Sequence, residues 1–373
     1  MKAAIFTIYG QSNYGNRFQN YGVFSNILKL GIDCESIISK QWTPTASRLR
    51  IEAQMRDRLR QDELEAQQES PLVVRQIRYE TFDGSYIPQR FIDAVHMPES
   101  IRSEYDFFIT GSDQVWNPQF RDSLGQIENR LLKFARPEQR VCFAPSFGID
   151  ALPEKWHDLY RRELCKFPYL NVREQTGAEI IRDLTGRNAD VVLDPTFMID
   201  KDEWLSLAKP MPGFDYEHPY ILYYFLGSEE EEISEDLRNF IDRVKKEREL
   251  VEYRLFRPED RLPYSAGPSE FLDLFNRAAL ICTDSFHGAV FSVILGKPFL
   301  LCNRRLVIAS QDIDMSNRTI SVMDRLQLQD KLPENQELTD DALWEYDYTN
   351  AHAIIQKEQK RMKGLLREAM RLA

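Results

Sequence analysis

The sequence predicts an α/β protein of two Rossmann-like domains that face each other across a cleft. Short runs of strand-forming residues alternate with segments of helical spacing, and this pattern is typical of β-α-β units in parallel sheets. With 373 residues the chain is too long for one ordinary domain. A stretch rich in proline separates two regions that each show the alternating pattern.

The first domain begins with a β-α-β unit. Ala3–Ile8 (AAIFTI) is predicted as a buried strand, Phe18–Leu30 has helical spacing and ends at Gly31, and Asp33–Ile38 is the next strand. Because a crossover helix joins consecutive strands, the sheet is expected to be parallel. The later strands and one helix are predicted at Tyr105–Thr110, Arg140–Ala144, Asn171–Arg173, Gln175–Leu184 (the helix) and Asp190–Leu193.

A helical insertion is predicted at residues 45–95. Ser47–Gln68 is charged, rich in helix formers, and contains neither glycine nor proline. This composition favours an exposed helix or helical hairpin inserted into the first domain, with a solvated charged face.

The second domain follows a linker. Residues 200–219 contain three prolines and one glycine, which is typical of a connection between domains. A helix is predicted over Glu229–Arg248, because its acidic start suits the positive end of a helix dipole. The remaining elements are strands at Tyr220–Leu226, Ala279–Thr283 and Pro298–Cys302, a helix after His287, and a largely helical segment at Ala342–Leu372.

These elements place one domain at residues 1–205 and the other at 206–340. A C-terminal helix at 341–373 is expected to pack back across them. In open α/β sheets, ligands bind beyond the carboxyl ends of the strands. The functional residues are therefore expected in the cleft, in the loops that follow the strands.

Composition excludes several classes of function. The net charge of −11 argues against broad binding to nucleic acid or to anionic membranes. No run approaches the roughly 18–20 apolar residues of a membrane span, and the apolar N-terminal stretch breaks at Gly10 without a signal-peptide pattern. Five scattered cysteines indicate reduced core residues in a cytoplasmic protein. Neither a CxxC nor an HExxH pairing offers a metal site, so no metal is expected.

One histidine stands where a strand meets a buried helix. In TDSFHGAVFSVILGKPFLLC (283–302), Asp284 or Ser285 is placed to cap a helix that Gly296 ends. His287 therefore lies in the first helical turn, where free N–H groups and the helix dipole attract an anion. The same positive end disfavours a protonated imidazole until an anion binds. This suits a general acid that acts on an anionic substrate, and the alternative is a histidine that only caps a loop carbonyl.

Two polar stretches follow strands of the first domain. SNYGNRFQNYG (12–22) is expected to form a loop between the first strand and the first helix, without the GxGxxG spacing of a dinucleotide site. Its candidate ligands to a sugar or phosphate are Asn13, Tyr14, Gly15, Asn16, Arg17, Gln19 and Asn20, and an ordinary asparagine-glycine turn is the alternative.

The second polar stretch is TGSDQVWNP (110–118). A tryptophan among amides and a carboxylate is a common way to hold a sugar, and Asp113 could accept a proton from a hydroxyl nucleophile. Asp113 as a helix cap and Trp116 as a core residue form the alternative. The candidate binding residues here are Gly111, Ser112, Gln114, Trp116 and Asn117.

Arg173 follows a short strand-like segment and precedes Glu174. Its guanidinium could form a fork for phosphate or carboxylate. Pairing with Glu174 or another acid is an equal alternative. Asp194–Pro195 is interpreted as a turn that ends a strand.

Six motifs occur in an order that resembles one family. They are NYGNRFQNYG (13–22), GSDQVWNP (111–118), APSFG (144–148), VREQTG (172–177), VVLDPTFMI (191–199) and DSFHGAVFSVILGKPF (284–299). Together they resemble the polysaccharide pyruvyl transferase family, from about residue 1 to 330 and without the insertion at 45–95.

The resemblance implies a fold like that of GT-B glycosyltransferases, with the acceptor on the side of domain 1–205 and the donor on the side of 206–340. It implies transfer of a pyruvyl group from phosphoenolpyruvate to sugar hydroxyls, which forms a ketal on an exopolysaccharide precursor. The family's histidine falls on His287 and its VRE arginine on Arg173, while Asp113 is our candidate base. Ser285, Phe286 and Gly288 surround the histidine as candidate binding residues.

The sequence departs from the family at one point. Some members carry an Arg-Leu pair before the histidine, and here the pair is Ser285–Phe286, so one positive charge is missing. Arg304, Arg305 and Arg318 are the candidates to replace that charge.

Two other functions fit the same pattern. A GT-B-type glycosyltransferase would bind a nucleotide sugar instead of phosphoenolpyruvate, and a non-catalytic carbohydrate-binding protein would tolerate the loss of His287. The expected partners are phosphoenolpyruvate as co-substrate and a nucleotide-linked or lipid-linked sugar acceptor, with no cofactor and no nucleic acid. The basic helix Lys357–Arg371 either packs on the domains or contacts the inner face of the membrane.

Overall fold

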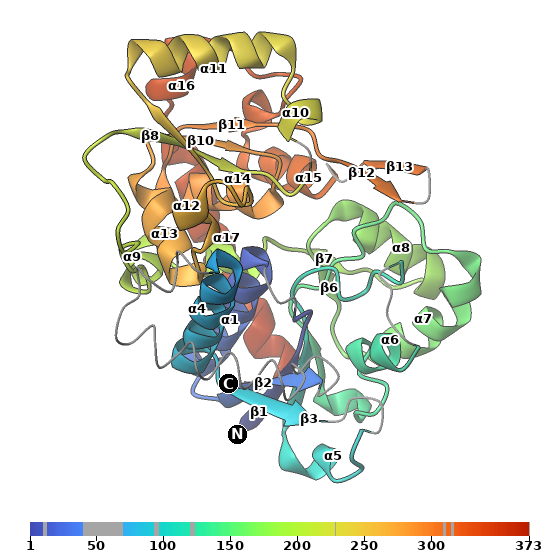
Figure 1. The fold of residues 1–373 in the computed structure, drawn as a ribbon. Helices are drawn as coiled ribbons and strands as arrows, with labels where there is room; N and C mark the ends of the chain where they lie inside the picture. Colours follow the sequence, from blue (N-terminus) through green and yellow to red (C-terminus); the bar gives the residue numbers. More distant parts are fainter. Residues whose placement is uncertain are drawn as a thin grey trace. The chain divides into compact units, whose positions relative to one another are not determined.

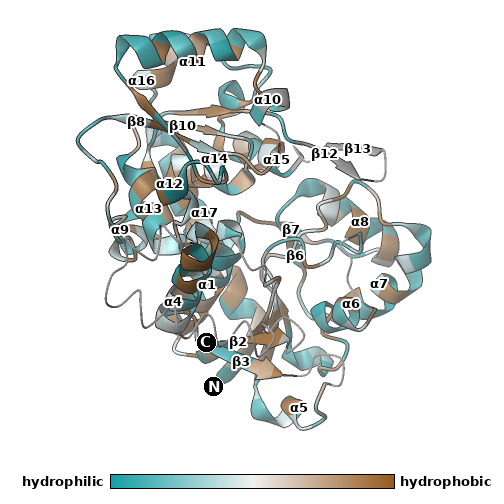
Figure 2. Ribbon diagram, in the orientation of Figure 1, coloured by the Kyte–Doolittle hydropathy of each residue, from teal (hydrophilic) through white to brown (hydrophobic). Residues whose placement is uncertain are grey.

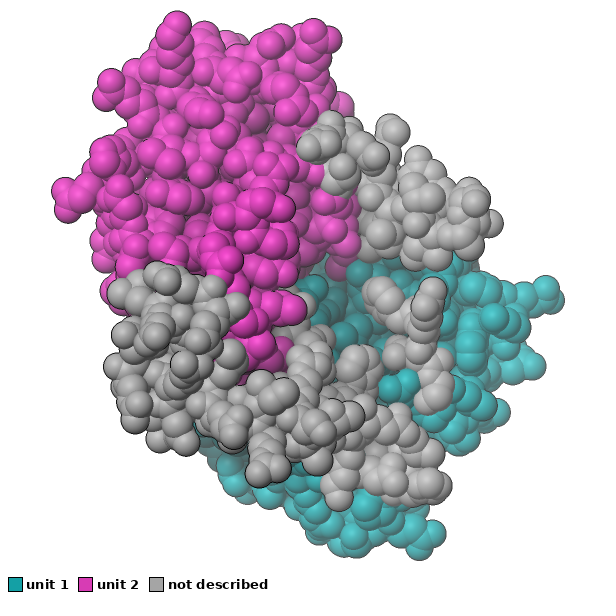
Figure 3. Space-filling model, in the orientation of Figure 1, with its two compact units in different colours: residues 1–43, 83–199, 356–373 teal, residues 44–82, 200–355 magenta. Residues whose placement is uncertain are grey.

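The computed structural model describes residues 1–9, 13–39, 70–92, 97–119, 124–227, 229–308, 311–314 and 317–372. The chain forms two compact units (Figure 3). Unit 1 comprises Met1–Thr43, Asp83–Ile199 and Gln356–Ala373, and unit 2 comprises Pro44–Phe82 and Asp200–Ile355. The predicted limits of the domains, and their arrangement across a cleft, stay predictions. The helix predicted over Ser47–Gln68 lies outside the described residues.

Unit 1 is built on a five-stranded parallel sheet with the order β3-β2-β1-β4-β5. Ala3 of the central strand pairs with Cys34 on one side and with Phe107 on the other. Such a sheet is covered on both faces, and the middle of β1 and all of β4 are accordingly buried. The strands are β1 (Lys2–Phe6), β2 (Asp33–Ser39), β3 (Gln89–Ile92), β4 (Phe107–Thr110) and β5 (Arg140–Cys142), and β6 (Asn171–Val172) pairs with β7 (Asp190–Val191) in a second sheet.

Helices cover the main sheet of unit 1, and a core of aromatic and aliphatic side chains lies between them and the strands. Trp116, Phe147 and Tyr160 belong to this core. The helices of unit 1 are α1 (Tyr14–Lys29), α5 (Ile101–Glu104), α6 (Leu124–Arg130), α7 (His157–Leu164) and α8 (Gln175–Thr185), with short 3-10 turns at Pro137–Gln139, Glu154–Trp156 and Pro195–Met198. Helix α4 (Pro71–Tyr86) contributes its first part to unit 2 and its end to unit 1.

Helix α1 begins four residues earlier than the sequence predicts. Asn13 caps it and accepts a hydrogen bond from the Asn16 amide at 3.2 Å, so the prediction of a loop over residues 14–22 was wrong. Every residue from Tyr14 to Ile27 is buried. Its polar side chains face protein on all sides and leave no apolar stripe, which is the signal that identifies a helix in a sequence.

Unit 2 is built on a four-stranded parallel sheet with the order β11-β10-β8-β9. Together with unit 1 it confirms the predicted α/β fold with two Rossmann-like sheets. The strands are β8 (Tyr220–Tyr224), β9 (Val251–Arg254), β10 (Leu280–Thr283) and β11 (Phe299–Leu301), and β12 (Arg305–Ile308) pairs antiparallel with β13 (Gln311–Asp314).

Two layers of helices enclose the sheet of unit 2 (Figure 1). Tyr223 contributes to the core beneath α11 and α16, whereas its neighbour Tyr224 contacts Phe271 of α13 on the opposite face. This alternation follows from the period of two along a strand. The helices are α9 (Lys201–Ser206), α10 (Glu229–Glu232), α11 (Glu235–Glu247), α12 (Arg261–Tyr264), α13 (Pro268–Arg277), α14 (Phe286–Leu295), α15 (Asn317–Leu326) and α16 (Asp340–Trp344), with a 3-10 turn at Gln329–Lys331.

Two predicted helices are interrupted. The helix expected over Glu229–Arg248 is divided into α10 and α11, because Ser234 accepts a hydrogen bond from the Leu237 amide at 3.3 Å and starts a new helix. Figure 2 shows that α11 is mostly hydrophilic with hydrophobic residues at intervals, and these apolar side chains are buried.

The segment predicted as helical over Ala342–Leu372 consists of the end of α16 and of α17 (Thr349–Ala369). In unit 1, Arg361 of α17 pairs with Asp190 at 2.5 Å. In unit 2, a ring nitrogen of His352 lies 2.7 Å from the Val293 carbonyl oxygen. None of the described helices is both long and apolar enough to span a membrane.

The five cysteines are all free, and four of them are buried. Burial raises the pKa of the Cys34 thiol to about 12 and does the same for Cys142. These buried thiols are therefore poor nucleophiles, as expected of core residues.

Candidate functional site

Each main sheet has a point where the strand order reverses. In unit 1, β1 lies between β2 and β4, and in unit 2, β8 lies between β9 and β10. The loops after such a pair of strands separate and leave a crevice, which is where open α/β sheets bind ligands. The polar motifs of the sequence follow these strands, so each unit has one candidate site.

At the reversal in unit 1, Asn16 of α1 meets Asp113 of the loop after β4. The Asn16 side-chain amide donates a hydrogen bond to Asp113 Oδ2. Asp113 has a positive φ of 75°, and its other oxygen accepts from the Gln114 amide at 2.8 Å. A non-glycine residue in this conformation is uncommon and is often found at functional sites. The tight loop therefore aims the carboxylate at the start of α1.

Arg173 lies close to Asp113 and forms a buried ion pair with Asp194. Its Nη1 donates to Asp194 Oδ2, and its Nη2 lies 3.9 Å from Asp113 Oδ1. Burial alone would lower the pKa of Arg173, but the Asp194, Asp113 and Glu174 carboxylates raise it above its usual value. The structure thus shows pairing with an acid, which was one of the two alternatives for this arginine.

A third carboxylate completes the group. Glu174 Oε1 accepts hydrogen bonds from the Phe147 amide at 2.7 Å and from the Ser146 hydroxyl at 3.0 Å, and so holds the loop after β5. Three carboxylates and one guanidinium are buried here. The excess of negative charge disfavours binding of an anionic ligand and suits a neutral hydroxyl group. Among the described residues, no group of three or more His, Cys, Asp or Glu side chains is arranged to hold a metal ion.

The other predicted residues of unit 1 mainly hold the fold. Arg17 Nε lies 3.1 Å from both oxygens of Asp83, and the guanidinium covers the Tyr9 ring at 3.9 Å. Asn20 accepts a hydrogen bond from Ser36. Trp116 is fully buried, packs on Phe147 and Phe167 and donates to the Arg130 carbonyl oxygen, so its ring presents no face to solvent. The buried positions also include Tyr14, Gly15, Gln19, Gly111, Ser112, Gln114 and Asn117.

At the reversal in unit 2, helix α14 follows β10 directly. Asp284 Oδ1 accepts from the Leu226 amide at 2.8 Å and its Oδ2 from the Gly227 amide at 2.7 Å, which joins the loops after β10 and β8. His287 lies in the first turn of α14, is 7% exposed and packs edge-on against Phe286. The predicted position of the histidine at a helix N-terminus is confirmed.

Two polar groups near this N-terminus have no hydrogen-bond partner in the part of the chain that the structure describes. They are the Ser285 hydroxyl, in a residue that is 1% exposed, and Arg304 Nε. Arg304 Nε lies 4.0 Å from Asp284 Oδ2, and the Arg318 guanidinium lies 5.6 Å from the Phe286 ring centre. The side chain of Arg305 lies outside the described residues. A buried donor without a partner is costly, so this end of α14 is suited to an anionic ligand.

Gly288 allows α14 to approach β10 closely. A Cβ atom at this position would lie 2.1 Å from Thr283 Oγ1, which itself donates to the Tyr224 carbonyl oxygen at 2.6 Å. We expect Gly288→Ala to lower the free energy of unfolding by about 1–3 kcal/mol, because the clash displaces the helix or the strand. Gly364→Ala is the control, since nothing lies within 4 Å of its Cβ position, and it should stabilise helix α17. If urea denaturation gave the same change in the free energy of unfolding for both variants, the close approach of α14 to β10 would be contradicted.

A family model for polysaccharide pyruvyl transferases matches residues 13–305, which is more than half of the chain. The chain belongs to the polysaccharide pyruvyl transferase family. It is therefore a transferase, and the resemblance of its six motifs to this family is confirmed. The match includes the polar motifs that follow β1, β4 and β10, and every candidate residue from Asn13 to Arg305.

Solved structures with low sequence identity were also found. Anabaena Alr3699/HepE in complex with UDP and glucose is 11% identical and has a TM-score of 0.48, with 100% of this chain and 99% of that chain covered. UDP-GlcNAc 2-epimerase from Neisseria meningitidis bound to UDP-GlcNAc is 12% identical and has a TM-score of 0.40, with 97% and 100% covered. No curated protein matches the sequence.

Asp194 and Asp284 were not predicted as site residues from the sequence. Both are carboxylates within a few residues of a strand end, the same signal that identified Asp113. Asp194 was assigned to a turn because proline follows it, and it does start one, accepting from the Thr196 amide at 2.9 Å. Its second oxygen was available for Arg173, which sequence spacing alone does not reveal.

Proposed function

We propose that the protein transfers a pyruvyl group from phosphoenolpyruvate to two hydroxyls of a sugar and releases phosphate. The observation that carries the proposal is the family match over residues 13–305, which includes a histidine at the N-terminus of a buried helix. The methylene carbon gains a proton, one hydroxyl oxygen bonds to the enol carbon, phosphate leaves, and the second hydroxyl closes the ketal. The two hydroxyl protons restore the acid and leave with phosphate.

The donor is proposed to bind at the start of α14. A helix N-terminus attracts phosphate and carboxylate groups, and Ser285 and Arg304 offer donors beside it. In this proposal Arg304 supplies the positive charge that some members of the family place just before the histidine. His287 then delivers a proton to the methylene carbon as general acid.

The sugar hydroxyl is proposed to be activated by Asp113. Hydrogen bonds from Asn16 and from the Gln114 amide hold this carboxylate in one orientation. Arg173 lies within 3.9 Å of it and is held in turn by Asp194, so it acts as a positioning residue rather than as a donor ligand. The acceptor is proposed to be a nucleotide-linked or lipid-linked precursor of an exopolysaccharide in the cytoplasm. The reaction as written needs no cofactor.

A thermal-shift titration with phosphoenolpyruvate, inorganic phosphate and nucleotide sugars tests the donor. A ligand at a hundred times its dissociation constant stabilises a protein by about 2.7 kcal/mol, which is a rise of several degrees. We expect this rise with phosphoenolpyruvate and a much smaller one in Arg304→Gln. Arg277→Gln is the control, because Arg277 is half exposed and pairs with Asp273 elsewhere in unit 2.

Other outcomes would point away from the proposal. A rise with nucleotide sugars alone would favour a glycosyltransferase. Binding of oligosaccharide without turnover, unchanged by loss of His287, would favour a carbohydrate-binding protein. A full phosphoenolpyruvate response in Arg304→Gln would remove Arg304 from the donor site.

A further inference from the structure

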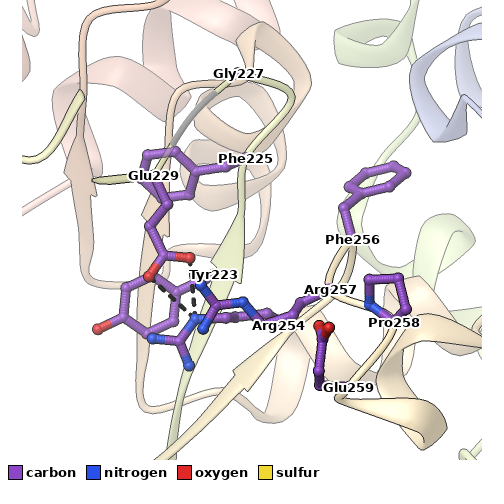
Figure 4. A pocket seen from close by; sticks show the side chains of 9 residues that line it. All are labelled: Tyr223, Phe225, Gly227, Glu229, Arg254, Phe256, Arg257, Pro258 and Glu259. Carbon is purple, nitrogen blue, oxygen red and sulfur yellow. Dashed lines mark hydrogen bonds and ion pairs between the residues drawn. The ribbon is translucent and has the colours of Figure 1, made fainter. Parts of the chain in front are cut away.

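Unit 2 contains a pocket that is separate from the start of α14. It opens beyond the carboxyl ends of β8 and β9, and its volume is about 280 Å³ (Figure 4). Pockets for drug-sized ligands begin at about 300 Å³, so this one has room for a single ring but not for a whole nucleotide sugar. The lining residues are Tyr223, Phe225, Gly227, Glu229, Arg254, Phe256, Arg257, Pro258 and Glu259.

The charges that line this pocket balance. Two arginines, Arg254 and Arg257, and two glutamates, Glu229 and Glu259, line it. Arg254 Nε lies 3.0 Å from each oxygen of Glu229, and this ion pair is drawn with dashed lines in Figure 4. A pocket without net charge does not favour phosphate or another anion. The ion pair nevertheless offers hydrogen-bond donors and acceptors side by side, which suits hydroxyl groups.

The aromatic rings that line the pocket already have neighbours, and the ring centres of Tyr223 and Phe225 lie 6.3 Å apart. Phe256 stacks on Tyr224 at 5.7 Å between ring centres, and the Arg75 guanidinium lies 4.1 Å from its centre. Arg254 lies over the Tyr223 ring at 4.5 Å. A nucleobase needs a free aromatic face on which to stack. A sugar ring needs only apolar contact on one side and polar partners at its hydroxyls, and Pro258 lies opposite Glu229 to provide that contact.

One residue connects this pocket to the start of α14. Gly227 lines the pocket, and its amide donates to Asp284, the residue before Ser285. We propose that the pocket binds a neutral, non-reacting sugar residue of the acceptor. The identity of the ligand as an acceptor rests on the proposed function, whereas the binding of a sugar at this place does not. The pocket would then select which polysaccharide unit is modified.

Saturation-transfer NMR tests the site with a panel of methyl glycosides of glucose, galactose, mannose and N-acetylglucosamine. We expect saturation of at least one glycoside by the wild-type protein and a loss of at least tenfold in affinity in Pro258→Trp, which fills the mouth of the pocket. Pro210→Trp is the matched control, because Pro210 is an exposed proline of unit 2 outside the pocket. Binding of no glycoside, or equal binding by both variants, would overturn the proposal.

A second comparison identifies the kind of ligand. Glu229→Gln leaves the pocket with a net positive charge, so glycoside affinity should fall about tenfold while inorganic phosphate gains affinity. Uridine that binds to the pocket in place of every glycoside would overturn the assignment to a sugar. The thermal shift with phosphoenolpyruvate should be unchanged in Pro258→Trp. Glycoside binding therefore tests this pocket, and the thermal shift with phosphoenolpyruvate tests the donor site independently.

Discussion

Replacing Asp194 with alanine is expected to lower the free energy of unfolding by about 3 kcal/mol. Asp194 is 1% exposed and pairs with Arg173, which is 6% exposed. Removal of one partner of a buried ion pair leaves an uncompensated charge and typically costs about 3–5 kcal/mol. We expect the lower end of this range, because Asp113 lies 3.9 Å from the guanidinium and can compensate part of the charge. Urea denaturation followed by circular dichroism measures the effect.

The matched control is the surface ion pair between Asp158 and Arg161. Its side chains are 95% and 50% exposed, and Asp158→Ala should change stability by no more than about 0.5 kcal/mol. A double variant, Arg173→Met with Asp194→Asn, removes both charges and keeps an acceptor for the Thr196 amide. It should recover part of the lost stability, since neither member of the pair is then left as an uncompensated charge. A loss below about 1 kcal/mol in Asp194→Ala would contradict a buried, structurally important pair.

His287→Ala is expected to reduce the rate of phosphate release from phosphoenolpyruvate, in the presence of acceptor, by about 10²–10⁴-fold. This is the usual contribution of a positioned general acid. The histidine is the only ionisable side chain in the first turn of α14, and neither Phe286 nor Gly288 can supply a proton. The measurement is a coupled phosphate assay at saturating phosphoenolpyruvate.

His218→Ala is the control for this experiment. The His218 side chain is 65% exposed, and its ring contacts Asp215 on the surface. The rate should not change in this variant. If His287→Ala keeps the full rate while its circular dichroism spectrum is unchanged, another group must deliver the proton, and the role of His287 is structural.

Local patterns predicted much of the fold. The run from Leu280 to Leu301 forms strand, helix and strand as its residues indicate, and Gly296 ends α14 with a φ of 67°. The period of apolar residues and the need for glycine in the left-handed region are local properties, so they can be read from the sequence. The position of His287 at the N-terminus of a buried helix follows from the same pattern.

The errors have a common cause. The start of helix α1 was predicted too late in the sequence, because a helix that is buried on every side has no apolar stripe. The helix that ends before Arg248 was predicted to run through Ser234, because the residue pattern did not reveal the capping hydrogen bond of this serine. Trp116 was a candidate for sugar binding on the basis of its polar neighbours, but it fills the core of unit 1. In each case the surroundings of the side chain, rather than its type, decided its role.

The sequence by itself determined the alternation of strands and helices, the family, and the residues that stand at the carboxyl ends of strands. Only the tertiary structure decided that Arg173 pairs with Asp194, 21 residues away, and that Arg254 pairs with Glu229 to form one side of a pocket. Strand and helix periods depend on neighbours a few positions away. Ion pairs depend on which loops the sheet order brings together, and strand order is a property of the folded chain.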